Sequence, residues 1–170
     1  VPSEQFKHSW FYTRDFSLST IDKNSHYQLN FEGINYKANI WLNGKKLADT
    51  TTIVGAFNRF TLLIDSAVLE GINHLAIELF PPSIGAYTIG FVDWAPTPPD
   101  NNMGIFRDVE LKITRNVEIK NTFVYSKVNL NTLSDADLFL STELLNYSNQ
   151  DQEVSLEGKI EEITFSHKIT

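Results

Sequence analysis

The feature that most constrains the fold of this chain is a series of short runs in which apolar residues recur at every second position. The two clearest are "HYQLNFEG" and "YKANIWLNG". Their alternating residues are Tyr27, Leu29 and Phe31, and then Tyr36, Ala38, Ile40 and Leu42. A period of two places such residues on one face of a β-strand. The second run ends at Asn43-Gly44, a pair that tolerates the positive φ angles of a tight hairpin, so both runs predict antiparallel strands.

Three further runs continue this pattern, "FNRFTLLID", "INHLAIELF" and "FRDVELKI". The apolar faces expected in the last two are Leu75, Ile77 and Leu79, and Val109, Leu111 and Ile113. The stretch "DSAVLEG" allows at most one helical turn, and no long amphipathic helix is predicted. Many antiparallel strands at short spacing predict an all-β chain with a sandwich or jelly-roll fold.

Near residue 117 the pattern changes to four more strand-like runs, "TFVYSKVNL", "DLFLSTELLN", "QEVSLEGKI" and "ITFSHKI". Their spacing resembles the first part of an immunoglobulin-like sandwich, a fold of about seven strands. We therefore expect two domains, residues 1–116 and a truncated second domain at 117–170. Half a sandwich leaves an apolar face and strand edges open, so we expect a fragment of a longer protein. The alternative is a small, complete second sheet packed on the first domain.

Charge and composition exclude several function classes. A formal net charge of -7 opposes binding to the phosphate backbone of nucleic acids. No apolar run approaches the roughly 20 residues of a membrane helix, so we expect no membrane partner. Without cysteine the chain has no disulfide and no thiolate metal site. The histidines lie in separate segments without ligand spacing, so we expect no metal and no cofactor; they are His8, His26, His74 and His167.

No catalytic residue is predicted within this chain. It has no nucleophile elbow, phosphate-binding glycine loop or zinc motif. Glycoside hydrolysis commonly needs two carboxylic acids that face one bond. Glu161 and Glu162 are adjacent, and neighbours on a strand point to opposite faces. Asp135 and Asp137 are expected in a solvated turn, and Asp108 in an ion pair or a turn.

The stretch "VDWAPTPPDNN" carries the strongest candidate for ligand binding. Asp93 supplies a hydrogen-bond acceptor and Trp94 a flat apolar platform. This pair suits a sugar, because hydroxyls donate to the carboxylate while the C–H face packs on the indole. The alternative is that Trp94 plugs the end of the sandwich and Asp93 caps a turn. Three prolines follow within five residues and stiffen the loop, which fits both interpretations. Trp10 and Trp41 are expected in the core or on strand faces.

Five segments together carry a family resemblance: "WFYTRDF", "LNFEGINYKANIWLNGKKLA", "GAFNRFTLLID", "LEGINHLAIELF" and "NMGIFRDVEL". In this order they resemble the N-terminal sugar-binding domain of glycoside hydrolase family 2, over Trp10 to Ile113. The resemblance implies a galactose-binding-like jelly-roll β-sandwich, then an immunoglobulin-like sandwich, then a (β/α)₈ barrel with two catalytic glutamates and a retaining mechanism. Nothing in this chain resembles that barrel, so we expect the fragment alone to be inactive.

In that family the loop ahead of the "GIFRDV" strand reaches over the barrel mouth and offers an acidic residue to the sugar. The resemblance therefore implies substrate-binding roles for Asp93 and Trp94, with Asp100 as the alternative acid. The long, proline-containing loop resembles the exo-β-glucosaminidase, endo-β-mannosidase and β-mannosidase branches more than the β-galactosidases. Arg107 and Asp108 are expected to join the loop to the sheet.

The leading hypothesis is a non-catalytic part of a family 2 glycoside hydrolase that helps to recognise a glycan or glycoside. The missing immunoglobulin-like and barrel domains are its expected partners in the same polypeptide, and open strand edges favour self-association. The alternatives are an independent carbohydrate-binding module and a structural or adhesion sandwich without sugar contact. The compartment stays open, with a secreted or periplasmic location favoured.

Overall fold

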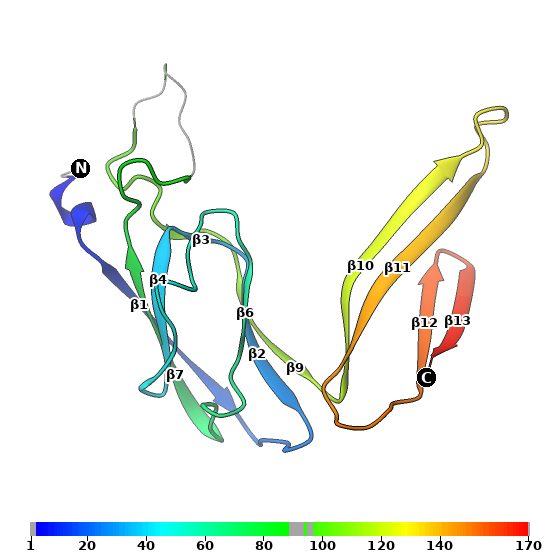
Figure 1. Ribbon diagram of the computed structural model, residues 1–170, viewed down its shortest axis with the longest axis horizontal. Coiled ribbons are helices and arrows are strands. Elements are labelled where there is room, and N and C mark those ends of the chain that lie inside the picture. The colour runs from blue at the N-terminus through cyan, green and yellow to red at the C-terminus, as the bar shows by residue number, and fades with distance from the viewer. Residues whose placement is uncertain (1–2, 89–93, 95–96, 170) are drawn as a thin grey trace. The chain divides into compact units, whose positions relative to one another are not determined.

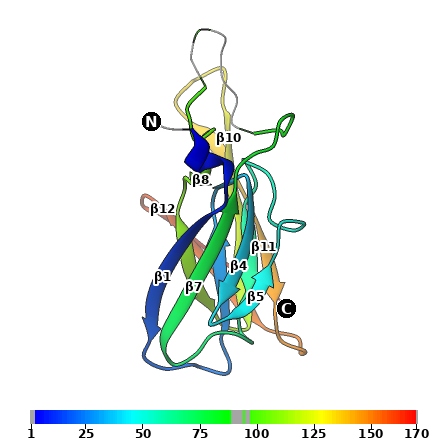
Figure 2. The same cartoon turned by 90° about the vertical axis from the view of Figure 1, so that its left-hand side faces the viewer.

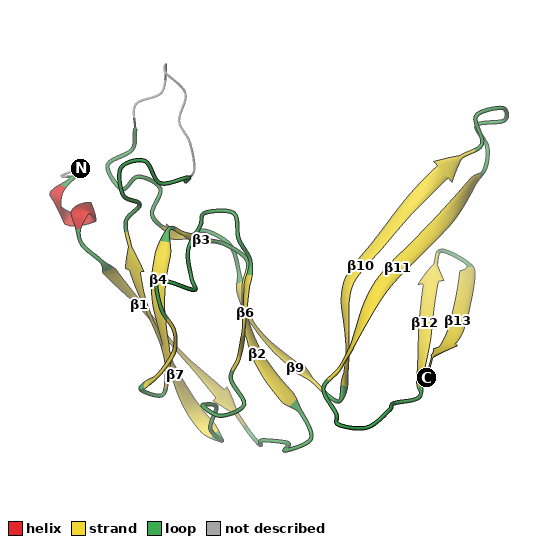
Figure 3. Ribbon diagram, in the orientation of Figure 1, coloured by secondary structure: helices red, strands yellow, loops and turns green. Residues whose placement is uncertain are grey.

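The structure, a computed structural model, describes residues 3–88, 94 and 97–169. The chain divides into two compact units, Val1–Ile113 and Thr114–Thr170. Figure 3 shows that strands account for almost all the regular structure of the described residues, which confirms the all-β prediction. No helix in this part of the chain is long and apolar enough to span a membrane.

The first unit is a two-layered β-sandwich (Figure 1). One sheet has the strand order β1-β7-β4-β5, the other β6-β2-β9, and β3 and β8 form a separate short pair. The elements are η1 (Glu4–Lys7), β1 (Trp10–Leu18), β2 (His26–Phe31), β3 (Ile34–Asn35), β4 (Lys37–Leu42), β5 (Lys45–Ala48), β6 (Phe60–Leu63), β7 (Gly71–Phe80), β8 (Gly104–Ile105) and β9 (Val109–Thr114).

The core of this sandwich is built from the alternating residues of β2, β4 and β7. Those buried to 6% exposure or less are Tyr27, Leu29, Phe31, Ala38, Ile40, Leu42, Leu75, Ile77 and Leu79. The predicted faces of these three strands are therefore confirmed, apart from half-buried Tyr36, which precedes β4. The prediction for β9 is only partly right: Val109 and Leu111 pack against the core, whereas Ile113 is half exposed.

The predicted hairpin at Asn43-Gly44 is confirmed by antiparallel pairing of β4 with β5. Both turn residues have positive φ, 52° and 80°, the conformation that favours this dipeptide. "DSAVLEG" makes one turn, in which the backbone N–H groups of Ala67 and Val68 both donate to the Ile64 carbonyl. The alternation rule did not find β1, since its first three residues are all aromatic and hide the period.

The second unit contains two antiparallel hairpins. They pair β10 (Val117–Val128) with β11 (Ala136–Asn146), and β12 (Val154–Ile160) with β13 (Ile163–Ile169). Four strands separated by polar turns are thus present as predicted. Glu161 and Glu162 differ from the expectation, because they form the turn between β12 and β13 rather than lying on a strand. Glu161 adopts a positive φ of 52° there.

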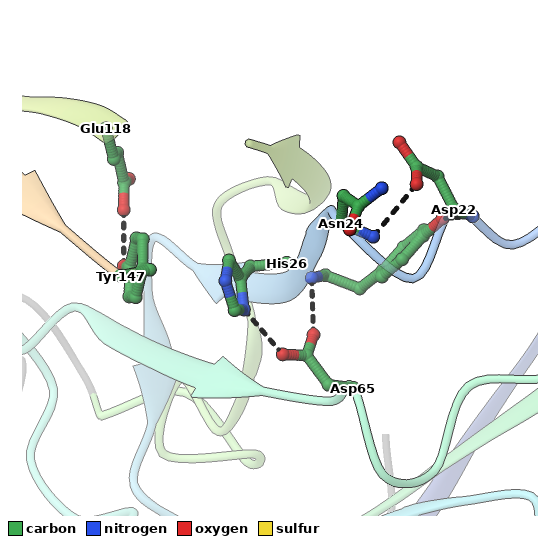
Figure 4. Close-up of polar contacts among 7 residues, drawn as sticks. Asp22, Asn24, His26, Asp65, Glu118 and Tyr147 are labelled. Atoms are coloured by element: carbon green, nitrogen blue, oxygen red, sulfur yellow. Dashed lines mark hydrogen bonds and ion pairs between the residues drawn. The ribbon is translucent and has the colours of Figure 1, made fainter. Parts of the chain in front are cut away.

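A buried carboxylate ties the end of the first hairpin to its beginning. The Tyr147 hydroxyl donates to Glu118 Oε2 at 2.5 Å, and the Tyr147 backbone N–H donates to the Asn116 carbonyl at 2.7 Å (Figure 4). Glu118 is only 3% exposed, and Lys120 Nζ lies 3.4 Å from the same oxygen. Burial, followed by the hydrogen bond to Glu118, raises the pKa of the Tyr147 phenol above 10.0.

A raised pKa in the folded state means that folding favours the neutral phenol. The associated stabilisation is complete below pH 10 and is lost as the pH rises through the folded-state pKa. We expect Tyr147→Phe to lower the unfolding free energy by about 1 to 2 kcal/mol at pH 8, and by less at pH 11. Urea denaturation at both pH values measures this difference. Tyr125→Phe is the matched control, because Tyr125 is half exposed in the same unit; a Tyr147→Phe deficit that does not shrink at pH 11 contradicts the assignment.

Candidate functional site

The segment 81–103 connects the end of β7 to β8 in the chain. Its described residues 81–88 and 97–103 lie at one end of the first unit (Figures 1 and 2). η1 and β3 lie at the same end. Pro81 and Pro82 end β7, because neither has an N–H with which to continue the sheet ladder. Two aromatic side chains of this segment are largely exposed, Tyr87 at 85% and Trp94 at 86%. Exposed aromatic rings on one segment are a usual basis for sugar contact.

The structure describes two of the three predicted binding residues, Trp94 and Asp100. Asp93 lies outside the described residues. Trp94 is described, and its exposure argues against the alternative in which it plugs the sandwich end. Asp100 accepts the backbone N–H of Asn102 at 3.0 Å through Oδ1, and its carbonyl accepts the Met103 N–H at 2.9 Å. This geometry gives Asp100 a role in shaping a turn.

The turn at 100–103 returns the chain to the sandwich. Asn101 and Asn102 adopt positive φ angles of 49° and 55°, a conformation that asparagine tolerates better than most residues. The Asn101 N–H donates to the Pro98 carbonyl at 3.0 Å, and the Met103 side chain that follows joins the core. These contacts therefore attach residues 98–103 to the sandwich just ahead of β8.

Asn35 was missed by sequence reasoning, although it lies at the centre of this site. It is completely buried, and its side-chain amide donates to the Asn102 carbonyl at 2.8 Å. Its Oδ1 accepts the Thr88 hydroxyl at 2.5 Å. The sequence does mark Asn35 as an inward-facing position. It follows Tyr27, Leu29 and Phe31 at the same period of two, with Gly33 between. A polar residue on an inward face usually has a specific hydrogen-bonding role.

The "GIFRDV" stretch joins the loop to the sheet through backbone and ring contacts. The Phe106 N–H donates to the Gly33 carbonyl at 3.2 Å, and the Glu32 N–H donates to the Asp108 carbonyl at 3.0 Å. The Phe106 ring covers Gly33 so closely that a Cβ there would lie 2.8 Å from Cζ. The Arg107 guanidinium lies 5.8 Å from the centre of the same ring. These contacts support the structural role expected for Arg107 and Asp108.

A mainly apolar cleft of about 420 Å³ opens between the edge strands β1 and β9 of the first unit. Its walls include Phe16, Ile77, Val109 and Leu111, and its polar lining residues are Tyr12, Thr13 and Arg14, all on β1. Because these polar groups lie on one wall only, the cleft is a weaker candidate for glycoside recognition than the segment that carries Trp94.

Two histidines of the sandwich, His26 and His74, each lie beside a carboxylate. His26 Nδ1 lies 2.8 Å from Asp65 Oδ2, while Asp65 Oδ1 accepts the Tyr27 backbone N–H at 2.6 Å (Figure 4). His74 Nδ1 lies 2.7 Å from Asp15 Oδ1. No cluster of three metal-ligating side chains occurs among the residues that the structure describes.

With this geometry in view, residues 3–86 match the family model of the glycosyl hydrolase 2 galactose-binding domain-like fold. The chain belongs to glycoside hydrolase family 2. Two exo-β-D-glucosaminidases resemble this family 2 chain: that of Amycolatopsis orientalis is 35% identical over 94% of the chain, and that of Streptomyces avermitilis 29% over 99%.

The same likeness extends to a solved structure. The exo-chitosanase CsxA of Amycolatopsis orientalis is 33% identical to this chain, with a TM-score of 0.89 over 99% of it. The chain spans 15% and 19% of the length of the two curated relatives, and 20% of the solved one. The resemblance found in the sequence is therefore confirmed at the level of the family and of its β-sandwich.

Proposed function

We propose that this chain is a non-catalytic part of a retaining glycoside hydrolase that acts on β-linked glucosamine, and that its 81–103 segment contacts the glycoside. The observation that carries the proposal is the display of Trp94, 86% exposed, on a segment fixed to a family 2 sandwich. Similarity to exo-β-D-glucosaminidases favours glucosamine over the other sugars cleaved in the family. A barrel elsewhere in the same polypeptide would supply the two catalytic carboxylates.

The role proposed for Asp93 follows from the chemistry of the sugar. A carboxylate accepts hydrogen bonds from sugar hydroxyls, and it also attracts the ammonium group of glucosamine. Trp94 adds an apolar face on which the C–H groups of the ring can pack. Asp100 is the weaker candidate, because its Oδ1 already accepts the Asn102 N–H.

The proposal predicts the effect of Asp93→Ala in the full-length protein. Removing a charged partner of a substrate hydroxyl costs about 1.5 to 3 kcal/mol, so kcat/KM for p-nitrophenyl β-D-glucosaminide should fall about tenfold to a hundredfold. Glu70→Ala is the control, because this exposed carboxylate precedes β7, at the opposite end of the strand from the 81–103 segment. Unchanged turnover in Asp93→Ala would exclude the proposed contact.

We also infer that the second unit is part of an immunoglobulin-like sandwich that further strands complete. Each of its hairpins presents alternating apolar residues, and several stay 38% to 46% exposed, namely Val124, Leu138 and Leu140. An isolated two-stranded hairpin is only marginally stable in water, so we expect additional strands to cover these apolar faces. Strands from the same polypeptide are the proposed cover, and self-association is the alternative.

A further inference from the structure

One buried side chain, that of Asn35, bonds to described residues on both sides of positions 89–100. Asn35 donates from Nδ2 to the Asn102 carbonyl at 2.8 Å and lies 3.4 Å from the Asn101 carbonyl. Its Oδ1 accepts the Thr88 hydroxyl at 2.5 Å. A single amide therefore bonds to residues on both sides of the segment that carries Trp94.

The backbone around Asn35 holds this side chain in a fixed position. β3 pairs with β8 in an antiparallel register that sets Asn35 opposite Gly104 and Ile34 opposite Ile105. Both Ile34 and Asn35 are completely buried. Because the side chain cannot reach water, breaking either hydrogen bond leaves a buried polar atom unsatisfied, and the arrangement resists rearrangement.

We propose that Asn35 is a positioning residue, which sets the separation of Thr88 and Asn102, the two points at which the chain leaves and rejoins the sandwich on either side of Trp94. The proposal rests on the function proposed above. Fixing both ends of a loop in advance removes part of the ordering cost that substrate binding would otherwise meet. The expected consequence is weaker glycoside binding when the Asn35 contacts are lost, although no atom of Asn35 touches the sugar.

Thr88 allows a test that leaves the core intact. Thr88 is half-buried, and Thr88→Val keeps its shape while removing the hydroxyl donor. Thr88→Ser retains the hydroxyl and is the conservative variant that should restore function. Asn35→Asp is the second variant, because it keeps the acceptor for Thr88 and replaces the amide donor with an oxygen facing two carbonyls.

The measurements are kcat and KM of the full-length protein with p-nitrophenyl β-D-glucosaminide. We expect Thr88→Val to raise KM about three- to tenfold with kcat little changed, since one hydrogen bond that supports binding is lost. Thr88→Ser should stay within about twofold of wild type. Asn35→Asp should raise KM at least as much as Thr88→Val. A purely structural role would instead lower the active fraction, and hence kcat, without changing KM.

Combination with Asp93→Ala separates this inference from the proposed function. If Asn35 acts through the segment, Thr88→Val should have little further effect in the Asp93→Ala background, because the two changes remove parts of one interaction. Suppose that Asp93→Ala strongly lowers kcat/KM while both Thr88→Val and Asn35→Asp keep the wild-type KM. That result overturns the positioning role alone. No effect of Asp93→Ala overturns the proposed function itself.

Discussion

Replacing Phe31 by alanine is expected to lower the unfolding free energy of the first unit by about 3 to 5 kcal/mol. Phe31 is completely buried at the end of β2, the middle strand of the β6-β2-β9 sheet, and lies opposite Phe60 in the ladder. Removing the ring opens a cavity between two sheets, each of which is stiffened by its own backbone hydrogen bonds. The surroundings cannot collapse into that space, which is why the upper part of the range is expected.

Urea denaturation followed by tryptophan fluorescence measures this loss. All three tryptophans, at positions 10, 41 and 94, belong to the first unit, so the signal reports on that unit and not on the hairpins that follow. Phe57→Ala is the matched control: Phe57 is 64% exposed in the same unit, and its loss should cost less than about 0.5 kcal/mol. Equal destabilisation by the two substitutions would show that the core is assigned wrongly.

The sandwich could be predicted from the sequence where one physical rule dominates. In β4 and β7, burial of one face imposes a period of two, so the pattern and the core coincide. In β2 the apolar residues follow the same period, although Gln28 between them is also buried. The rule failed at β1, an edge strand whose first six residues are all exposed, because no burial difference between its faces shapes the sequence there. It also missed the two-residue pair β3-β8, since two residues are too short to show any period.

The candidate site could be predicted only in part. Composition and the prolines singled out the segment, and its resemblance to family 2 named Asp93 and Trp94. The anchoring by Asn35 depends on Thr88 and Asn102, which lie 53 and 67 residues away in the chain. Hydrogen bonds over such separations leave no local pattern; the one trace is a polar residue at a position where the alternation expects an apolar one.

Asn73 is a second polar residue in an inward position, and its removal is the other change for which we expect a large effect. It continues the period of Leu75, Ile77 and Leu79 in β7 and is completely buried. Its Oδ1 accepts the Leu69 N–H and an Asn43 side-chain hydrogen, both at 2.8 Å. Its amide donates to the Leu69 carbonyl at 2.7 Å and to the Gly71 carbonyl at 3.2 Å. One side chain thus connects the β6-β7 link to the hairpin turn of β4 and β5.

Asn73→Ala should lower the unfolding free energy by about 3 to 4 kcal/mol, because it removes four hydrogen bonds, each of which contributes about 0.5 to 1.5 kcal/mol. Asn73→Asp tests the donors separately, since it keeps the acceptor but turns a carboxylate oxygen toward two carbonyls; it should destabilise as much at pH 7. Asn24→Ala, at an exposed asparagine of the same unit, is the control. The fluorescence-monitored urea midpoint is the readout, and a loss below about 1 kcal/mol in Asn73→Ala would mean that water or neighbouring groups replace the amide.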